Sequence, residues 1–379
     1  MGAGGIVTRQ DAEVAKYKSL CIHLLGVLCA FARNTFFMNT TPSLSEMISE
    51  WPTVSVVVVT RNRRSLAMKA VESILGTEYP NDKRQLVIIE ETDSSEHPFN
   101  QSGIKYCRLP VRNLGVAFAR NEGLRQADSN IVAFTDDDCL VDPQWLKQIV
   151  CPFVTAPPLG ATAGAVLVPE CGPIGQCENI LGFPGGGAKY LRQSKGQTIP
   201  MATFSTCNAA INRNVSGSVQ FPEGFLTAGE DSVLSRQISS KHGLLYNPKA
   251  VVRHKPRDSL PLVFNWFRGR GQARVRVVQY EKRPVRYILK TLAISQTLRL
   301  LGLVIALWLL NLPVFYPVLF LAALYYLSVL WRFRWAQEYY PSLKTFFLIP
   351  VVKTVMDVGM DAGVFTTLIK EGYARRLHL

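Results

Sequence analysis

Short apolar runs alternate with segments of helical spacing between Trp51 and His254. The runs are rich in β-branched residues and end in polar residues, which is typical of buried strands in a parallel sheet. Helices are predicted at residues 65–75 and after the glycine turn within Asn113–Gly123. Strands are predicted at residues 54–59, 85–89, 104–109, 131–134, 203–212 and 244–254. This alternation predicts a doubly wound α/β fold, in which ligands bind at the carboxyl ends of the strands.

The predicted strand at 131–134 is followed by Thr135 and then by three carboxylates, Asp136, Asp137 and Asp138. Adjacent carboxylates repel one another, so the cluster calls for a compensating cation. Hard divalent ions such as Mg²⁺ and Mn²⁺ prefer a few carboxylates together with the oxygens of a bound phosphate. The sequence therefore predicts a metal–diphosphate site at this strand end. Asp142, by contrast, is expected to cap the helix that begins near Pro143.

A second acidic element, GEDSVLSRQI, places Glu230 and Asp231 at the start of a predicted helix. A carboxylate in this position is stabilised by the helix dipole, so capping is one interpretation. The irregular approach through Gly229 favours a second interpretation, in which an acidic side chain points into a cleft. Both interpretations stay open at this point.

Composition narrows the possible partners. The formal net charge of +14 indicates an anionic partner, such as lipid headgroups or diphosphates. The chain has no dense Lys/Arg arm and no aromatic-studded basic sheet motif, so nucleic acid is not expected. It also lacks GxGxxG and GxxxxGK[ST], the signatures of dinucleotide and P-loop sites. The eight cysteines form no CxxC pair and are expected to be reduced, mostly buried thiols.

The C-terminal third changes in character. Residues 261–290 are basic and rich in aromatic residues, which predicts an amphipathic segment on an anionic membrane surface, with some arginines holding diphosphate. Residues 291–331 are strongly apolar and predict a transmembrane hairpin whose two spans meet at residues 311–313. Lysine and arginine flank both ends of the hairpin, at Arg286, Lys290, Arg332 and Arg334, and this predicts a catalytic domain on the cytoplasmic side.

Two further segments are predicted to associate with the membrane. Residues 345–369 form a helix with Lys353, Asp357 and Asp361 on one face, which excludes a lipid-facing span. This helix is expected to lie in the membrane plane or to pack on the hairpin, with Gly359 and Gly363 permitting close approach. The first fifty residues contain the apolar run 20–32, which predicts a peripheral segment. This run could be an interfacial helix or an uncleaved signal-like segment, or it could result from the choice of start codon.

The segment from Val54 to His254 resembles family 2 glycosyltransferases of the GT-A fold. The motifs that carry the resemblance are VSVVVVTRNR, IIEETDSS, NLGVAFARNEG, FTDDDCLVDPQWL, TCNAAINR and GEDSVLSRQ, which occur in the family's order. The resemblance implies a GT-A-like mixed sheet followed by C-terminal membrane helices. The implied division is 1–50, a catalytic domain at 51–260, a basic segment at 261–290, the hairpin at 291–331 and a membrane-associated helix and tail at 332–379.

The resemblance also implies roles for single residues. Asp136 and Asp138 match the DxD motif and would bind a divalent ion, either Mn²⁺ or Mg²⁺, with His254 as a third ligand. His254 as a ligand would favour Mn²⁺. Asp231 matches the catalytic base. The residues implied to bind the donor are Thr60, Asn62, Glu90, Gly115, Asp136 and Asp137. At position 90 the family usually has an Asp, which is replaced here by Glu. The residues implied to bind the acceptor are Thr206, Cys207, Asn208 and Glu230.

Together these features predict a membrane-attached, metal-dependent, inverting glycosyltransferase. It would transfer one sugar from a cytosolic nucleotide sugar to a lipid-linked saccharide acceptor of a cell-surface glycan pathway. The divalent ion would stabilise the leaving diphosphate, and a carboxylate would take the proton of the acceptor hydroxyl. A processive polysaccharide synthase is an alternative, although QxxRW is absent and the spans are few. A non-catalytic membrane-bound nucleotide-sugar-binding protein and a nucleotidyltransferase are further alternatives.

Overall fold

The computed structural model describes residues 48–370, except for residues 100, 102, 112, 157, 226, 227, 285 and 312. The chain divides into two compact units, Met1–Met47 and Ile48–Leu379, and the described residues belong to the second. The peripheral segment that the sequence predicts around residues 20–32 therefore lies outside the described residues.

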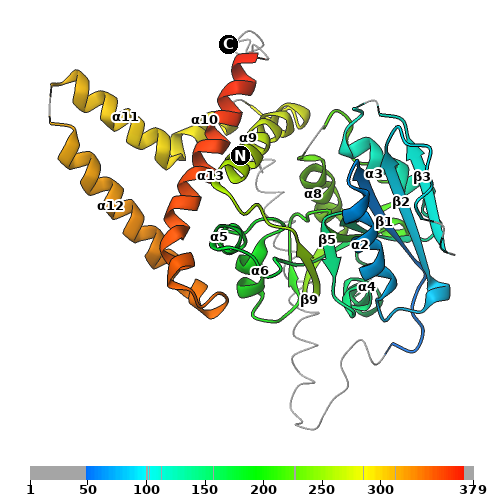
Figure 1. The fold of residues 1–379 in the computed structure, drawn as a ribbon. Helices are drawn as coiled ribbons and strands as arrows, with labels where there is room; N and C mark the ends of the chain where they lie inside the picture. Colours follow the sequence, from blue (N-terminus) through cyan, green and yellow to red (C-terminus); the bar gives the residue numbers. More distant parts are fainter. Residues whose placement is uncertain are drawn as a thin grey trace, which may run out of the picture. The chain divides into compact units, whose positions relative to one another are not determined.

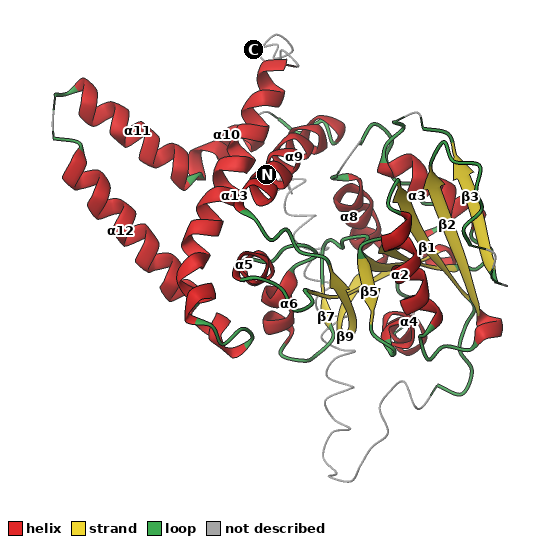
Figure 2. Cartoon of the chain, in the orientation of Figure 1, coloured by secondary structure: helices red, strands yellow, loops and turns green. Residues whose placement is uncertain are grey.

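A mixed β-sheet forms the centre of the fold (Figures 1 and 2). Within the described residues it has nine strands in the order β3-β2-β1-β4-β8-β6-β9-β5, with β7 paired to β9. Strands β1 to β4 run parallel, whereas β8 is antiparallel to both β4 and β6. The strands are β1 Val54–Arg61, β2 Arg84–Glu91, β3 Ile104–Leu109, β4 Ile131–Asp136, β5 Cys139–Val141, β6 Ala161–Leu167, β7 Ile199–Pro200, β8 Asn208–Asn212 and β9 Leu244–His254.

Helices cover both faces of this sheet because its strands are apolar on both sides. In β1, Val56 and Val58 belong to the core that contains α2 and α4, whereas Val57 belongs to the core that contains α3 and α8. This alternation follows from the period of two in a strand. The helices are α2 Arg64–Leu75, α3 Val116–Gln126, α4 Trp145–Thr155, α5 Pro173–Ile180, α6 Gly187–Ser194, α7 Arg213–Ser216 and α8 Glu230–His242, with a short 3₁₀ turn at Asn81–Lys83. The predicted doubly wound mixed sheet is thus confirmed.

Two local predictions in this part are wrong. Asp142 does not cap α4, which begins at Trp145; its side chain instead pairs with Arg253 on β9, Nε to Oδ1 3.2 Å. The strand predicted at 203–212 contains only residues 208–212, because the Asn208 amide turns back to the Ser205 carbonyl at 3.0 Å. In both cases a contact within the fold overrides the local sequence preference.

Five helices follow the sheet: α9 Leu260–Tyr280, α10 Arg286–Ile294, α11 Gln296–Leu309, α12 Phe315–Arg332 and α13 Leu343–Lys370, with a 3₁₀ turn at Arg334–Glu338. Of the two predicted spans, the first is interrupted at Ser295, whose hydroxyl caps α11 by accepting from the Leu298 amide. Helix α11 therefore has only 14 residues. Among the described helices, α12 alone is by itself long and apolar enough to cross a membrane, and α11 contains the shorter apolar stretch Leu298–Leu309, so the two-span hairpin stays a prediction.

Helix α9 packs closely along α13 at three glycines, Gly271, Gly359 and Gly363. A Cβ atom at Gly363 would lie 2.0 Å from the Arg268 carbonyl oxygen, and one at Gly359 would lie 2.7 Å from the Phe264 carbonyl oxygen. The predicted close approach is therefore present, but its partner is α9 and not the hairpin. Because Phe267 and other apolar residues of α9 are buried in this contact, α9 is a packed helix and not a segment lying free on a membrane.

Replacing Gly271 by Ala is expected to lower the free energy of unfolding, whereas Gly269→Ala in the same helix is not. A Cβ at position 271 would lie 2.1 Å from the Met360 carbonyl oxygen, but one at position 269 would meet nothing within 4 Å. Overpacking of this kind costs about 1–3 kcal/mol, while Ala is about 1 kcal/mol better than Gly inside an open helix. Denaturant unfolding of the detergent-solubilised chain measures both variants. Equal midpoints would contradict the close packing.

Candidate active site

The three aspartates lie where β4 ends, beside the ends of β1 and β2. The Thr60 hydroxyl donates to Asp137 at 2.7 Å, and Arg63 forms ion pairs with Asp137 (2.5 Å) and Asp138 (3.0 Å). Burial raises the pKa of Asp137 to about 6, although the Thr60 hydrogen bond and Arg63 act against that rise. Thr60 and the acidic cluster thus meet as the sequence predicts. Arg63 was not among the predicted site residues. Its position in the turn after β1 is the only sequence feature that points to a role at this site.

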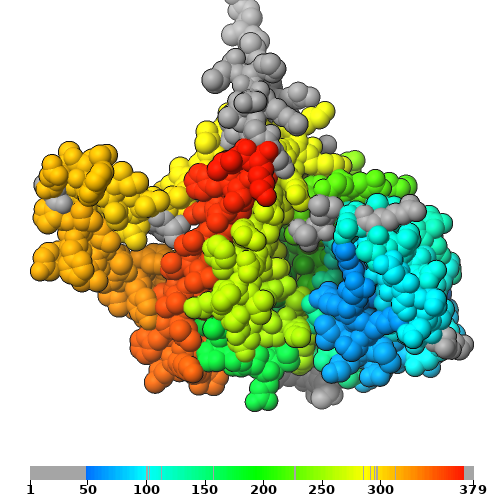
Figure 3. All heavy atoms as spheres, turned by 45° about the horizontal axis from the view of Figure 1, so that its top comes forward, coloured from blue at the N-terminus to red at the C-terminus, as the bar shows by residue number. Residues whose placement is uncertain are grey.

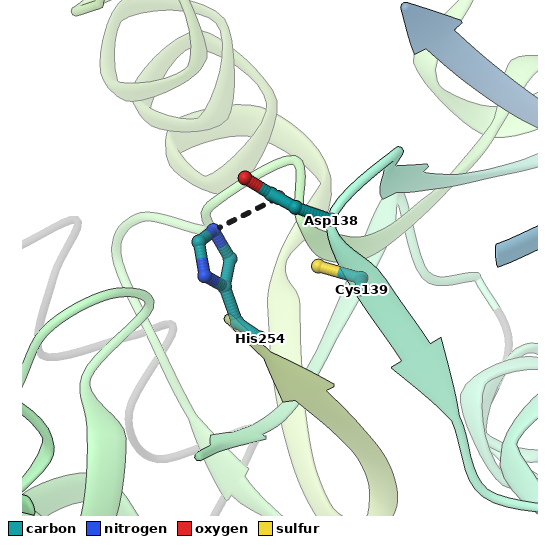
Figure 4. A group of neighbouring side chains, drawn as sticks. All are labelled: Asp138, Cys139 and His254. Carbon is teal, nitrogen blue, oxygen red and sulfur yellow. Dashed lines mark ion pairs between the residues drawn. The ribbon is translucent and has the colours of Figure 1, made fainter. Parts of the chain in front are cut away.

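Asp138 and His254 face one another across the paired strands β5 and β9 (Figure 4). Asp138 Oδ1 and His254 Nε2 are 3.4 Å apart, and the donor atoms of Asp138, Cys139 and His254 all lie within 4.8 Å of one another. His254 Nδ1 contacts the Lys255 carbonyl at 2.8 Å, and this contact orients the ring with Nε2 toward Asp138. Burial raises the pKa of Cys139 well above its ordinary value, so its thiol stays protonated. Carboxylate and imidazole are therefore the donors that fit a divalent ion here.

Asp136 is not part of this group; it pairs with Arg120 at 3.0 Å. The other arm of the same guanidinium pairs with Glu230, the first residue of α8. Arg120 and Glu230 are both buried, and burial raises the pKa of Glu230 while Arg120 lowers it. This Asp136–Arg120–Glu230 chain joins the two acidic elements, which are far apart in the sequence. No sequence motif singles out Arg120, although it shares one face of α3 with the buried Ala117 and Leu124.

A pocket of ≈ 200 Å³ lies beside Asp231. The Asp231 side chain accepts from the Ser232 amide at 2.7 Å and lines this pocket together with Lys189, Phe183 and Arg270. The Arg270 guanidinium lies over the Phe183 ring at 5.1 Å and makes no ion pair among the described residues. Figure 3 shows the surface hollowed between α9 (yellow-green) and the segments coloured blue and cyan. The pocket is thus lined by the Asp231 carboxylate, by Lys189 and by the Arg270 guanidinium, which lies over aromatic rings.

The residues implied to bind the acceptor mostly make contacts within the fold. Thr206 and Cys207 are buried, and the Cys207 carbonyl accepts from Thr135 at 3.0 Å. Asn208 lines the pocket, but its side chain is fully engaged: it accepts from the Trp145 indole at 2.9 Å and donates to the carbonyls of Ala165 and Ala250, both at 2.8 Å. These bonds tie β8 to α4, β6 and β9. Its role at the acceptor stays a prediction.

Asn208→Ala is expected to lower the free energy of unfolding by roughly 2–4 kcal/mol, because three buried groups lose their partner. The exposed Asn214 provides the matched control, and Asn214→Ala should unfold like the natural chain. Denaturant unfolding and initial transfer rates should be measured together. A stable Asn208→Ala variant with a raised KM for acceptor would contradict the structural role and support acceptor contact.

The residues implied for the donor lie along the same edge of the sheet. Glu90 is fully buried, and its carboxylate accepts from Arg64 at 2.9 Å and from the Tyr106 hydroxyl at 2.7 Å. Asn62 is exposed and has a left-handed backbone (φ 53°) just before α2, and Gly115 has φ 92° just before α3. Glu90 would have to exchange its present partners in order to bind a base, so its role stays a prediction.

Three comparisons bear on the identity of the chain. Residues 55–216 match the family model described as Glycosyl transferase family 2; this match ends before Glu230, Asp231 and His254. Glycosyltransferase AglE of Haloferax volcanii is 25% identical over 244 residues, which cover 60% of this chain and 76% of AglE. Beta-monoglucosyldiacylglycerol synthase of Synechocystis sp. is 27% identical over 119 residues, which cover 29% of this chain and only 25% of that relative.

A solved structure shares the fold. The mannosyltransferase of Pyrobaculum calidifontis, in complex with GDP-mannose and Mn²⁺, superposes with a TM-score of 0.51 at 19% identity and covers 91% of this chain and 94% of its own. At this identity the likeness bears on the fold alone. The match of residues 55–216 identifies this segment as a family 2 glycosyltransferase domain, and the mixed sheet and the likeness to the mannosyltransferase show that its fold is of the GT-A type.

Proposed function

We propose that this protein is an inverting, divalent-metal-dependent glycosyltransferase that uses a nucleoside diphosphate sugar. The observation that carries the proposal is the convergence of the two acidic elements: Asp138 faces His254, and Asp136 reaches Glu230, next to Asp231, through Arg120. Family 2 relatives that transfer sugars support the same activity.

Asp138 and His254 would hold the metal ion. Their donor set, one carboxylate oxygen and one imidazole nitrogen, is suited to Mn²⁺ and tolerates Mg²⁺ less well. When bound, the ion supplies Lewis-acid stabilisation of the leaving diphosphate. Thr60 and Arg63 position the neighbouring Asp137, so the acidic turn keeps its conformation. Arg63, whose side chain is about half exposed, is free at its outer side to meet a phosphate oxygen.

Asp231 would take the proton from the acceptor hydroxyl. Asp231 lines the pocket, and one of its carboxylate oxygens accepts from the Ser232 amide. A general base must lie within hydrogen-bond reach of the proton it removes, and a pocket bounded by Asp231 offers that position. Glu230 is bound to Arg120 and would orient the start of α8, while Arg270 adds a positive charge to the same pocket.

The acceptor is proposed to be a lipid-linked saccharide at a membrane, reached from the cytoplasmic side. Helix α12 supports this because it has spanning length and only 11% of its apolar window is buried, and because Arg332 and Arg334 lie at its C-terminal end. The name of the Synechocystis relative includes a diacylglycerol lipid, which also supports a lipid acceptor. Transfer of one sugar, and not of many, would distinguish this enzyme from a processive synthase, and turnover would distinguish it from a sugar-nucleotide-binding protein.

Removal of divalent ions is expected to abolish transfer, with Mn²⁺ restoring more activity than Mg²⁺. A panel of nucleotide sugars, assayed for donor hydrolysis and for transfer to lipid extracts with and without a chelator, is the measurement. His254→Ala should raise the Mn²⁺ concentration needed for half-maximal rate by at least about tenfold. His242→Ala, at the far end of α8, is the control and should behave like the natural chain. Undiminished transfer in the presence of chelator would remove the metal from the proposal.

A further inference from the structure

A second pocket, of ≈ 370 Å³, lies among the C-terminal helices and shares no residue with the pocket beside Asp231. Its walls come from α9, α12 and α13 and from the break between α10 and α11. The charged or polar side chains that line it include Arg274, Tyr325, Arg332, Lys353, Asp357 and Asp361. A charged pocket at the base of an apolar helix is costly unless it binds something.

The acids of this pocket are already engaged. Asp357 pairs with Lys353 at 2.7 Å, and Asp361 accepts from the Ser295 hydroxyl at 2.5 Å. Arg274 has only a longer-range attraction to Asp361, and the Arg332 guanidinium lies over the Phe333 ring at 5.9 Å. Within the described part of the chain neither arginine forms an ion pair or a side-chain hydrogen bond. Two guanidinium groups are therefore left to bind an anion.

A third group points to the same ligand. The Tyr325 hydroxyl oxygen is buried, and Thr354 and Asp357 lie near it without a hydrogen bond of good geometry among the described residues. A buried hydroxyl held this loosely can donate to a ligand with acceptor oxygens. Guanidinium groups and a hydroxyl together form the donor set that suits a phosphate ester. With three cations against two carboxylates, the lining also has a net positive charge.

The surroundings indicate where that phosphate comes from. Leu321 and Leu324 precede Tyr325 on α12 and are 40% and 46% exposed, and Leu327 just after it is 60% exposed. Acyl chains lying along these residues would place a headgroup at the level of Tyr325 and Arg332, since a phospholipid joins its phosphate directly to apolar chains. A free phosphate would gain nothing from this apolar face.

We propose that this second pocket binds the headgroup phosphate of an anionic membrane phospholipid, whose acyl chains lie along α12. The proposal rests on the membrane attachment proposed above but not on glycosyl transfer. Arg274 is one helical turn from Arg270 of the first pocket, so α9 would carry one arginine to each site. A lipid held by Arg274 would thus fix the middle of α9, where Arg270 borders the active-site pocket.

Native mass spectrometry of the full chain, exchanged from detergent into phosphatidylglycerol or phosphatidylcholine nanodiscs, tests the proposal. The natural chain should retain phosphatidylglycerol after release. Arg274→Gln combined with Arg332→Gln should lower that retention by about tenfold or more, the loss expected when charge-assisted hydrogen bonds are removed. Tyr325→Phe, which conserves the ring, should lower it a few-fold. Donor hydrolysis by each variant in detergent is measured in parallel. This separates a loss of enzyme activity from a loss of bound phosphatidylglycerol.

Arg286→Gln combined with Lys290→Gln is the charge-matched control, because both side chains are exposed on α10 and neither lines the pocket. This variant should retain phosphatidylglycerol like the natural chain. An equal loss in the control would show that general surface charge holds the lipid and would overturn the pocket. Displacement of the lipid by inorganic phosphate alone, or equal retention of phosphatidylcholine, would also overturn the proposal, because the site would then not select an anionic phospholipid.

Discussion

Asp231→Asn is expected to lower the rate of sugar transfer by about 10²–10⁴-fold, the range that a positioned general base contributes. Asparagine has nearly the same shape and can still accept from the Ser232 amide, so the start of α8 should be unchanged. It cannot, however, take a proton. Because Asp231 lines the pocket while its neighbour Glu230 is bound to Arg120, Glu230 cannot substitute for it.

The measurement for Asp231→Asn is the initial rate of transfer from the nucleotide sugar that gives turnover, together with the dissociation constant for that donor. Donor affinity should be unchanged within a few-fold, which separates loss of the base from loss of the site. Asp82→Asn, in an exposed turn before β2, is the control and should keep the full rate. An Asp231→Asn variant that transfers sugar at the natural rate would exclude Asp231 as the base.

Arg120→Met is expected to lower the free energy of unfolding by about 3–5 kcal/mol, the cost of leaving a buried charge without its partner. Glu230 is almost completely buried, and Arg120 is its only charged partner within ion-pair distance among the described residues. Asp136 would lose its partner as well. Methionine fills a similar volume, so the loss would come from charge and not from a cavity. Denaturant unfolding in detergent is the measurement.

Two further variants test whether the loss comes from the unpaired carboxylate. Arg120→Met combined with Glu230→Gln should recover part of the stability, because the buried charge is removed along with its partner. Arg125→Met lies one turn further along α3 and removes only an exposed ion pair with Glu122, so its unfolding midpoint should not move. If the double variant were as unstable as Arg120→Met alone, the Arg120–Glu230 pair would not be the source of the effect.

Much of the sheet could be predicted from the sequence because its strands are apolar on both faces. The bounds of β3 and β9 agree with the predicted ranges, and the ends of β1 and β4 agree to within a few residues. The polar residues at those ends could also be placed at one edge, since parallel strands end together. Thr60 and Asp137, 77 positions apart, are brought into contact for that reason.

The remaining features depend on contacts between segments that local patterns do not encode. Asp142 has the composition of a helix cap, yet Arg253 from β9 takes its carboxylate. Asn208 matches a family motif, but three buried partners occupy its side chain. Hydropathy alone does not reveal that Ser295 interrupts the first apolar segment, because serine is tolerated in membrane helices. Arg120 was missed because its two partners come from β4 and α8.

The packing of the C-terminal helices has a practical consequence for anyone who wants a smaller, soluble enzyme. One apolar core contains Ile180 of α5, Ala188 of α6, Phe267 of α9 and Met356 of α13, so it crosses the boundary that the sequence suggested near residue 260. A fragment ending after β9 would expose the inner sides of α5 and α6 to water and would be expected to aggregate. A shortened version should instead keep α9, α13 and the C-terminal end of α12, whose Val329 belongs to the same core, and replace only the projecting remainder of α11 and α12 by a short linker (Figure 1).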